Sequence, residues 1–200
     1  MKRMLGCGIV ALVLVVVVGA VFFWGVGISN GLIARQVAVD GAWAQVENVY
    51  QRRADLIPNL VETVKGASNF EKSTLQAVID ARAKATQMVV TPEVVNDPAK
   101  FQQFQKVQGE LSGALSRLLA VAENYPDLKA NQNYLELQSQ IEGTENRIAQ
   151  ERQRFNTAVT DYNTAIRVFP ASLIASLRGF KAKEFFQADS GSEKAPQVKF

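Results

Sequence analysis

Hydrophobic positions follow two patterns along this chain: a continuous apolar run near the N-terminus, and helical stripes after it. The run Leu5–Ile28 contains no Lys, Arg, Asp or Glu and is long enough for a helix to cross the roughly 30 Å apolar core of a bilayer. Phe22, Phe23 and Trp24 lie near its far end, where aromatic rings favour the boundary between lipid and water. The run therefore predicts a membrane anchor over residues 1–30. It does not fit a cleaved signal peptide, whose apolar part is shorter and ends at small residues.

Beyond the anchor, apolar residues recur alternately four and three positions apart, which is the spacing of one face of an α-helix. The first stripe consists of Val39, Trp43, Val46, Tyr50, Arg53, Ile57, Leu60 and Val64. Arg53 stands in it where an apolar residue is expected. Pro58 predicts a kink in this helix, because proline removes one helical hydrogen bond.

The next two helices are expected over about 70–89 and from Pro98 to about Asn124. The inner face of the earlier one is predicted to hold Leu75, Val78, Ile79, Ala81 and Ala85. The segment 90–98 is interpreted as a connection, in which Asp97 caps the helix that Pro98 begins. The later helix carries the stripe Phe101, Phe104, Gln108, Leu111, Leu115, Leu118, Ala122 and Tyr125.

The longest helix is expected over 131–169, with a seam of residues seven positions apart. The seam consists of Tyr134, Ile141, Ile148, Phe155, Tyr162 and Phe169. Asn156 and Asn163 share one face of this helix, and they either fix the register between helices or lie in solvent. A short amphipathic segment follows, and residues 188–200 are predicted to form a disordered tail. The chain is thus expected to be all-α, with an N-terminal transmembrane helix followed by an elongated antiparallel four-helix bundle in residues 31–187.

The charge distribution favours one orientation in the membrane. Lys2 and Arg3 precede the apolar run, whereas only Arg35 follows it before Asp40, so the positive-inside bias places the N-terminus in the cytoplasm and the body outside. The remaining 20 basic and 19 acidic residues nearly balance, which gives no electrostatic reason to expect a nucleic-acid partner.

Composition narrows the possible chemistry. The chain has 0 His and 1 Cys, so the commonest general base and the usual zinc and Cys–His sites are excluded. Glu142, Glu145 and Glu151 could in principle form a carboxylate metal site, but such sites usually include histidine. No catalytic residue, cofactor or metal is predicted, and an enzyme using carboxylates and a metal is the least favoured alternative.

The segment Arg52–Val61 is the most distinctive local cluster. One interpretation is a recognition surface or kink. The alternative, which the physics favours, is an ion pair of Arg53 with a carboxylate inside the bundle, with Asp55 capping a helix that restarts at Pro58.

Several segments together closely resemble the LemA family. The resemblance is carried by Ala42–Val46, Arg52–Gly66, Glu71–Lys84, Leu111–Asp127, Leu128–Arg147, Asp161–Arg167 and the Phe169-Pro170 junction. It implies a bacterial inner-membrane protein with one N-terminal helix, a helical body and no established enzymatic activity. It also points to envelope maintenance and to a membrane metalloprotease of the HtpX type as a partner. The hallmark residues, as interaction or structural positions, are Trp43, Arg52, Arg53, Asp55, Pro58, Asn59 and Lys65.

The leading functional hypothesis is a non-enzymatic, membrane-anchored scaffold or adaptor that acts by protein–protein contact or self-association. The alternative is a protein that binds or remodels the membrane surface. In that case Leu173, Leu177 and Phe180 form a membrane-proximal segment, whose apolar and basic composition is typical of an interface. Docking of this segment onto the bundle is the simpler explanation.

Overall fold

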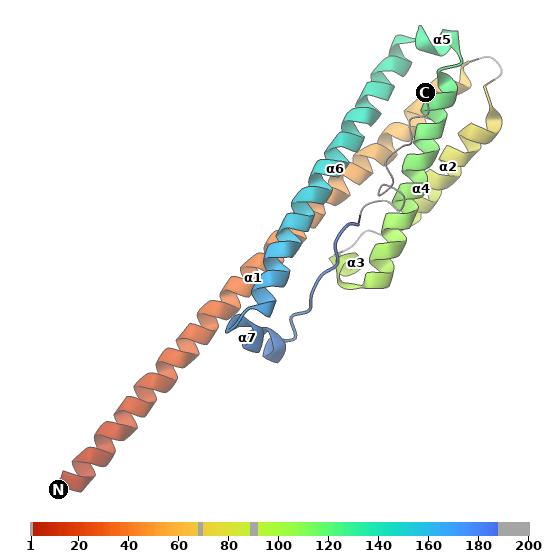
Figure 1. Cartoon of the computed structure of the whole chain (residues 1–200). Coiled ribbons are helices and arrows are strands. Elements are labelled where there is room, and N and C mark those ends of the chain that lie inside the picture. The colour runs from red at the N-terminus through yellow and green to blue at the C-terminus, as the bar shows by residue number, and fades with distance from the viewer. Residues whose placement is uncertain (1, 68–69, 89–91, 188–200) are drawn as a thin grey trace, which may run out of the picture. The chain divides into compact units, whose positions relative to one another are not determined.

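A computed structural model describes residues 2–67, 70–88 and 92–187, with side chains from residue 12 onward except that of Pro92. Every regular element in these ranges is a helix, as the stripes predict (Figure 1). The elements are α1 (Lys2–Lys65), α2 (Lys72–Gln87), α3 (Pro92–Asn96), α4 (Pro98–Ala122), α5 (Pro126–Lys129), α6 (Gln132–Arg167) and α7 (Ala171–Arg178). The predicted tail lies outside the described residues.

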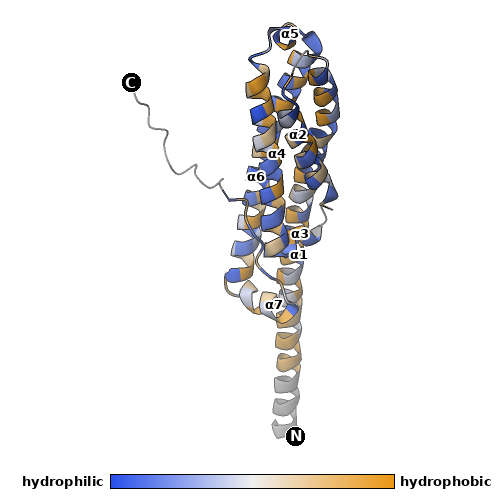
Figure 2. Ribbon diagram, turned by 90° about the vertical axis from the view of Figure 1, so that its right-hand side faces the viewer, coloured by the Kyte–Doolittle hydropathy of each residue, from blue (hydrophilic) through white to orange (hydrophobic). Residues whose placement is uncertain are grey.

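Helix α1 is the one helix in the described ranges long and apolar enough to cross a membrane. Its side chains from Leu12 to Val18 and from Val21 to Trp24 are exposed, and Figure 2 colours the lowest described turns of α1 orange. An apolar helix with no protein around it is what a lipid environment requires.

The second half of α1 carries the predicted stripe, and all eight members from Val39 to Val64 are buried. The helix continues through Pro58, which lies on its exposed side. The predicted cap by Asp55 is therefore wrong, because no helix restarts there. The Asp55 carboxylate instead accepts a hydrogen bond from Gln51 Nε2 at 2.8 Å.

Capping explains where two later helices begin. The Asp97 carboxylate accepts hydrogen bonds from the backbone N–H groups of Ala99 at 2.9 Å and Lys100 at 3.3 Å, which confirms the predicted start of α4. Asn131 Oδ1 accepts from Tyr134 N at 3.2 Å in the same way at the start of α6.

Four details of the sequence prediction were wrong. On α2 the predicted inner-face residue Ile79 is exposed and Thr74 is buried instead, whereas the other four predicted residues are buried. The connection 90–98 contains the short helix α3, and the turn after α4 contains α5; neither is long enough to show a helical period. Helix α6 ends at Arg167, and Phe169 beyond it is 79% exposed instead of continuing the seam.

The chain divides into two compact units. One consists of Met1–Val39 with Ala158–Ala182, and the other of Asp40–Thr157 with Lys183–Phe200. In the first unit, buried side chains of α1, α6 and α7 form the packing; they include Leu32, Val39, Val159, Tyr162, Ile166 and Ala175.

The second unit has a core that draws on α1, α2, α4 and α6. Its members include Ile57, Leu60, Val64, Leu75, Val78, Leu111, Leu115, Leu118, Tyr134 and Ile141. Each of these helices contributes the face that its stripe marks, so burial of these stripes supplies the main stabilisation of the unit.

Candidate functional site

Arg53 is a buried charged residue of the second unit, with 1% of its surface exposed. Its Nη1 donates to Ser112 Oγ at 2.6 Å and to Glu145 Oε1 at 2.8 Å. Its Nη2 donates to the side-chain oxygen of Gln108. One guanidinium on α1 is thereby bonded to two residues of α4 and one of α6. The ion pair inside the body that the sequence favours for Arg53 is present.

The aromatic ring of Tyr50 completes the surroundings of Arg53, since the guanidinium carbon lies 5.0 Å from the ring centroid. Arg53 Nε is buried and has no acceptor among the described residues. Glu145 differs from Arg53 because 36% of its side chain stays exposed. The network therefore reaches from the core to the surface at Glu145.

A groove of about 770 Å³ lies over this network, between α4 and α6. Gln108, Ser112 and Glu145 all line it, so the partners of Arg53 form part of its wall. Gly109 and Gly113 also line it, and a Cβ added at either position would meet nothing within 4 Å. The groove is thus open along the α4 side and has room for a side chain of another molecule.

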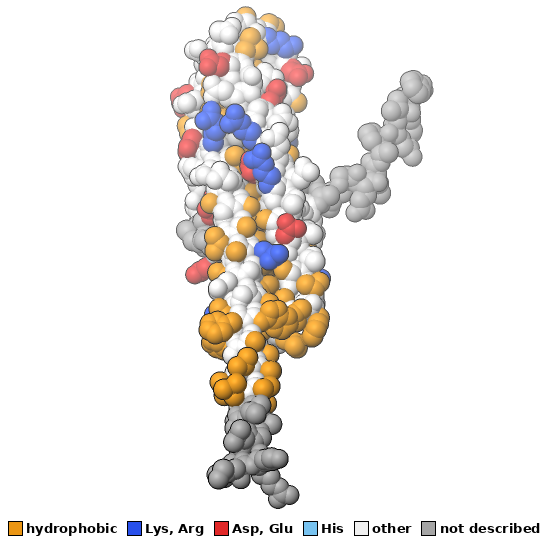
Figure 3. Space-filling model, turned by 90° about the vertical axis from the view of Figure 1, so that its left-hand side faces the viewer, with side chains coloured by type: hydrophobic (Ala, Val, Ile, Leu, Met, Phe, Trp, Pro, Cys, Tyr) orange, Lys and Arg blue, Asp and Glu red, His pale blue; other side chains and the backbone are white. Residues whose placement is uncertain are grey.

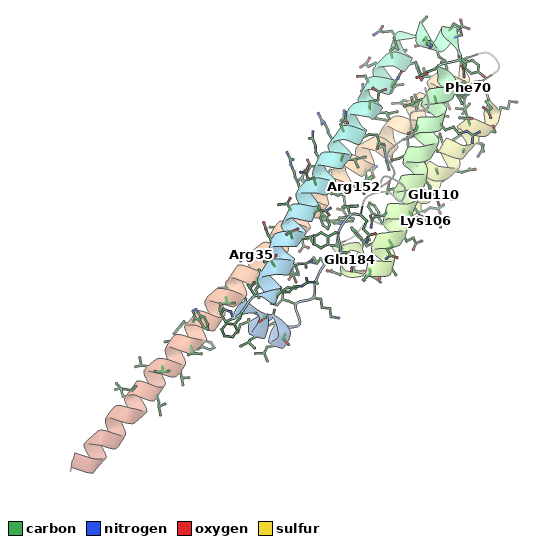
Figure 4. The ribbon with its side chains drawn as sticks, in the orientation of Figure 1. Arg35, Phe70, Lys106, Glu110, Arg152 and Glu184 are labelled. Carbon is green, nitrogen blue, oxygen red and sulfur yellow. The ribbon has the colours of Figure 1, made fainter. Side chains whose placement is uncertain are left out.

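Two basic side chains border the groove. Lys106 comes from α4 and Arg152 from α6, and both are labelled in Figure 4. Arg152 Nη2 donates to the carbonyl of Gln187 at 2.9 Å, and its guanidinium carbon lies 4.8 Å from the Phe186 ring centroid. Because the Glu145 carboxylate is paired with Arg53, the border carries net positive charge and favours an acidic, hydrogen-bonding ligand.

Trp43 is the centre of an aromatic cluster in the same unit. Its ring centroid lies between 5.2 and 6.1 Å from those of Phe101, Phe104, Phe155 and Phe186. Burial raises the pKa of the neighbouring Glu47 carboxyl above its ordinary 4.5. Trp43 thus has a packing role.

The other hallmark residues lie on the exposed surface of α1. They are Arg52, Asp55, Pro58, Asn59 and Lys65. Lys65 Nζ pairs with Glu62 at 2.7 Å, and the Asn59 carbonyl accepts from Thr63 Oγ1 at 2.8 Å. The hallmark is therefore divided between two buried residues that hold the core and five that face outward.

Residues 183–187 belong to the second unit and form no helix. Asn156 donates to the Phe186 carbonyl at 3.0 Å and accepts from the Phe186 N–H at 2.9 Å. Asn163 is 5% exposed, so it is not in solvent. The sequence favours docking of the segment that ends with Phe185 and Phe186, and the burial of Phe186 agrees with this, but no helical period predicts where Phe186 packs.

Lys183 is the second buried cation of this unit. Its Nζ donates to Asn96 Oδ1 at 2.6 Å and lies 3.8 Å from the Asp40 carboxylate. Burial lowers the pKa of Lys183 below its ordinary 10.5, and the charge of Asp40 opposes the shift.

The three glutamates considered for a metal do not come together. Glu142 accepts from Gln138 Nε2 at 3.0 Å, Glu151 pairs with Arg154 at 2.6 Å, and Glu145 binds Arg53. Within the described ranges, no three His, Cys, Asp or Glu residues gather in a way that could hold a metal ion.

The first unit has a groove of its own, of about 990 Å³, between α1 and α6. Small residues such as Gly27, Gly31 and Ala165 line it, together with Arg35 and Asp161. Arg35 Nη1 donates to the Gly31 carbonyl at 3.1 Å, so the cation is bonded to its own helix. This groove holds none of the hallmark side chains.

Comparison with known proteins gives one family and several relatives. The model of the LemA family matches residues 42–200. Magnetosome protein MamQ of Magnetospirillum gryphiswaldense is 27% identical over 156 residues, which is 70% of this chain and 57% of that protein. Magnetosome protein MamQ 1 of Paramagnetospirillum magneticum is 28% identical over 157 residues, 70% of this chain and 58% of that protein. The chain thus spans little more than half the length of these MamQ relatives. Protein LemA of Metamycoplasma hominis is 25% identical over 175 residues, 87% of this chain and 75% of that protein.

Proposed function

The chain belongs to the LemA family, and from this premise we propose that it is a non-enzymatic, membrane-anchored adaptor whose groove between α4 and α6 binds an acidic segment of a protein partner. The observation that carries the proposal is the Arg53 network, which ties α1, α4 and α6 together beneath that groove. A groove whose walls are fixed before binding loses little conformational entropy when a ligand enters.

Membrane anchoring by α1 supports the adaptor role. A tether confines the body to the membrane and raises its effective concentration near other membrane proteins. The basic residues Lys2 and Arg3 ahead of the apolar run favour a cytoplasmic N-terminus, with the body outside the inner membrane of a bacterium. We take the body to be an antiparallel four-helix bundle of α1, α2, α4 and α6, and the core shared by these helices supports this.

The test is site-specific photo-crosslinking of the full-length protein in its native membrane. A photoreactive amino acid replaces Gly113 in the groove or, as a matched control, Gly143 on α6. Both glycines are helical and exposed, and neither has an atom within 4 Å of an added Cβ, so neither substitution should disturb the fold. We expect a discrete adduct from position 113 and none from 143.

A blocking variant decides whether the groove itself is occupied. Gly109→Trp fills the groove from α4 and is expected to abolish the adduct from position 113, whereas Gly143→Trp leaves it intact. An adduct with twice the mass of the chain identifies the partner as a second copy, and any other mass identifies a different protein. Equal adduct yield from both positions, or an adduct that survives Gly109→Trp, refutes the proposal.

A further inference from the structure

Helix α7 lies against α1 next to the end of the apolar run, within the first compact unit. Ile174 Cδ1 is 3.8 Å from where a Cβ of Gly25 would be, and Arg178 Nη1 donates to the hydroxyl of Ser29. The two contacts are four residues apart on both helices. The turn 174–178 of α7 therefore lies beside the turn 25–29 of α1.

The two faces of α7 differ in their surroundings. Ala175 is buried and Ile174 half-buried on the side that meets α1, whereas Leu173 is 58% and Leu177 84% exposed on the other side. Leu173 and Leu177 are one helical turn apart and so share a face. Phe169, just before α7, is also exposed, and these three side chains are the apolar patch that no part of the described chain covers.

The patch is continuous with the lipid-facing surface of α1. The exposed aromatic residues of α1 immediately precede Gly25, where α7 makes contact. They are Phe22, Phe23 and Trp24, and they are 58–75% exposed. Figure 3 shows hydrophobic side chains gathered around this part of the molecule. A bilayer that surrounds α1 as far as its aromatic residues must also meet whatever is packed beside Gly25.

We propose that α7 is a second membrane contact, an interfacial helix that inserts Phe169, Leu173 and Leu177 into the leaflet from which α1 emerges. The exposed basic residues Arg178 and Lys181 follow the apolar ones and meet the phosphate groups of the lipids. Gly179, with φ of +73°, ends the helix at this point, and the Phe180 N–H bonds back to the Ala175 carbonyl at 3.0 Å. The inference rests on the anchoring by α1 that is part of the proposed function.

A second membrane contact restricts how the protein can move in the bilayer. A single spanning helix leaves the protein free to rotate about its axis and to tilt. A second apolar contact to one side of that axis restricts both movements, because rotation would lift Leu173 and Leu177 out of the lipid. The first compact unit would then keep a fixed orientation relative to the bilayer.

The test places a fluorophore at single cysteines in full-length protein with Cys7→Ser. The protein is reconstituted in vesicles of phosphatidylethanolamine and phosphatidylglycerol, some of whose acyl chains carry a spin-label quencher. The labelled positions are Leu177→Cys on α7, Phe23→Cys on α1 and Gly143→Cys on α6 as the aqueous control. All three residues are exposed, so labelling should not perturb packing.

We expect quenching at position 177 to be at least about half of that at position 23, since an interfacial helix lies at shallow depth, and no quenching at position 143. Quenching at 23 with none at 177 overturns the inference while leaving the anchor intact. A blue-shifted but unquenched label at 177 also overturns it, because a protein and not lipid would then cover the patch. Absence of quenching at 23 overturns both the anchor and the inference.

Discussion

Replacing Arg53 by methionine should destabilise the body much more than the same change at its neighbour Arg52. Methionine keeps the length and packing of the arginine stem but removes the charge and the hydrogen bonds to three helices. Removing one partner of a buried ion pair costs about 3–5 kcal/mol. Glu145 retains 36% exposure of its side chain and can regain water, so the cost lies near the lower end. Gln108 is only 6% exposed, so its amide oxygen loses the Arg53 donor without gaining water in its place. The destabilisation by Arg53→Met should therefore not fall below this range.

We therefore expect Arg53→Met to lower the free energy of unfolding by about 3 kcal/mol, equivalent to a decrease in Tm of about 6–12 °C for a chain of this size. Arg52 is exposed on the same helix, and Arg52→Met should change the stability by at most about 0.5 kcal/mol. Thermal unfolding of the full-length variants in detergent, followed by circular dichroism and tryptophan fluorescence, measures both.

A double variant separates the ion pair from simple packing. Arg53→Met with Glu145→Met removes both charges, so its cost should be smaller than the sum of the single costs by about 1 kcal/mol or more. If Arg53→Met and Arg52→Met lower Tm equally, or if the two single costs add without coupling, the network does not hold the three helices together.

Three further predictions concern other parts of the second unit. Asp97→Ala should cost about 1 kcal/mol through loss of the α4 cap, and Asp97→Asn, which retains the acceptor, should restore most of that Tm. Because the pKa of Lys183 is lowered in the folded state, the unfolded chain binds more protons between that lowered pKa and 10.5, and stability should rise with pH across this window. Urea unfolding at several pH values should show the rise in the parent but not in Lys183→Met; equal slopes would refute it. Phe186→Ala should cost about 3 kcal/mol or more and shift the emission of Trp43 to longer wavelength, as the aromatic cluster opens. An unchanged spectrum would contradict the packing of the final segment.

The sequence was sufficient to predict the helices, because each long one buries a stripe with the helical period. The stripe on α4 is buried from Phe101 to Ala122 as expected. The same pattern could not predict the short helices α3 and α5, because each spans only about one turn and cannot show a helical period. Phe169 was assigned to a seam by its spacing alone, although Pro170 after it restricts the backbone and α6 ends at Arg167.

The Arg53 network could have been predicted more fully than it was. Arg53 and Gln108 are the polar members of two otherwise apolar stripes, and Glu145 lies on a third, mixed helix. Polar residues forced into a core must find one another, because an unpaired buried charge is costly. The groove could not be inferred in this way. It depends on the distance between α4 and α6 and on the path of residues 183–187, and the spacing of apolar residues along the sequence specifies neither.

The presence of arginine at position 53 is itself informative. A leucine there would complete the apolar stripe of α1, and well-packed apolar residues often stabilise a protein as much as a buried ion pair does. Arginine differs from leucine because its hydrogen bonds are directional. Its nitrogens bind fixed acceptors on α4 and α6, so neither helix can rotate about its own axis without breaking a bond to α1. Rotation of α4 would carry Gly109 and Gly113 out of the groove, because they lie on the same turns as Gln108 and Ser112. We infer that arginine at position 53 fixes the shape of this surface in addition to stabilising the body, as the proposed binding of a partner requires.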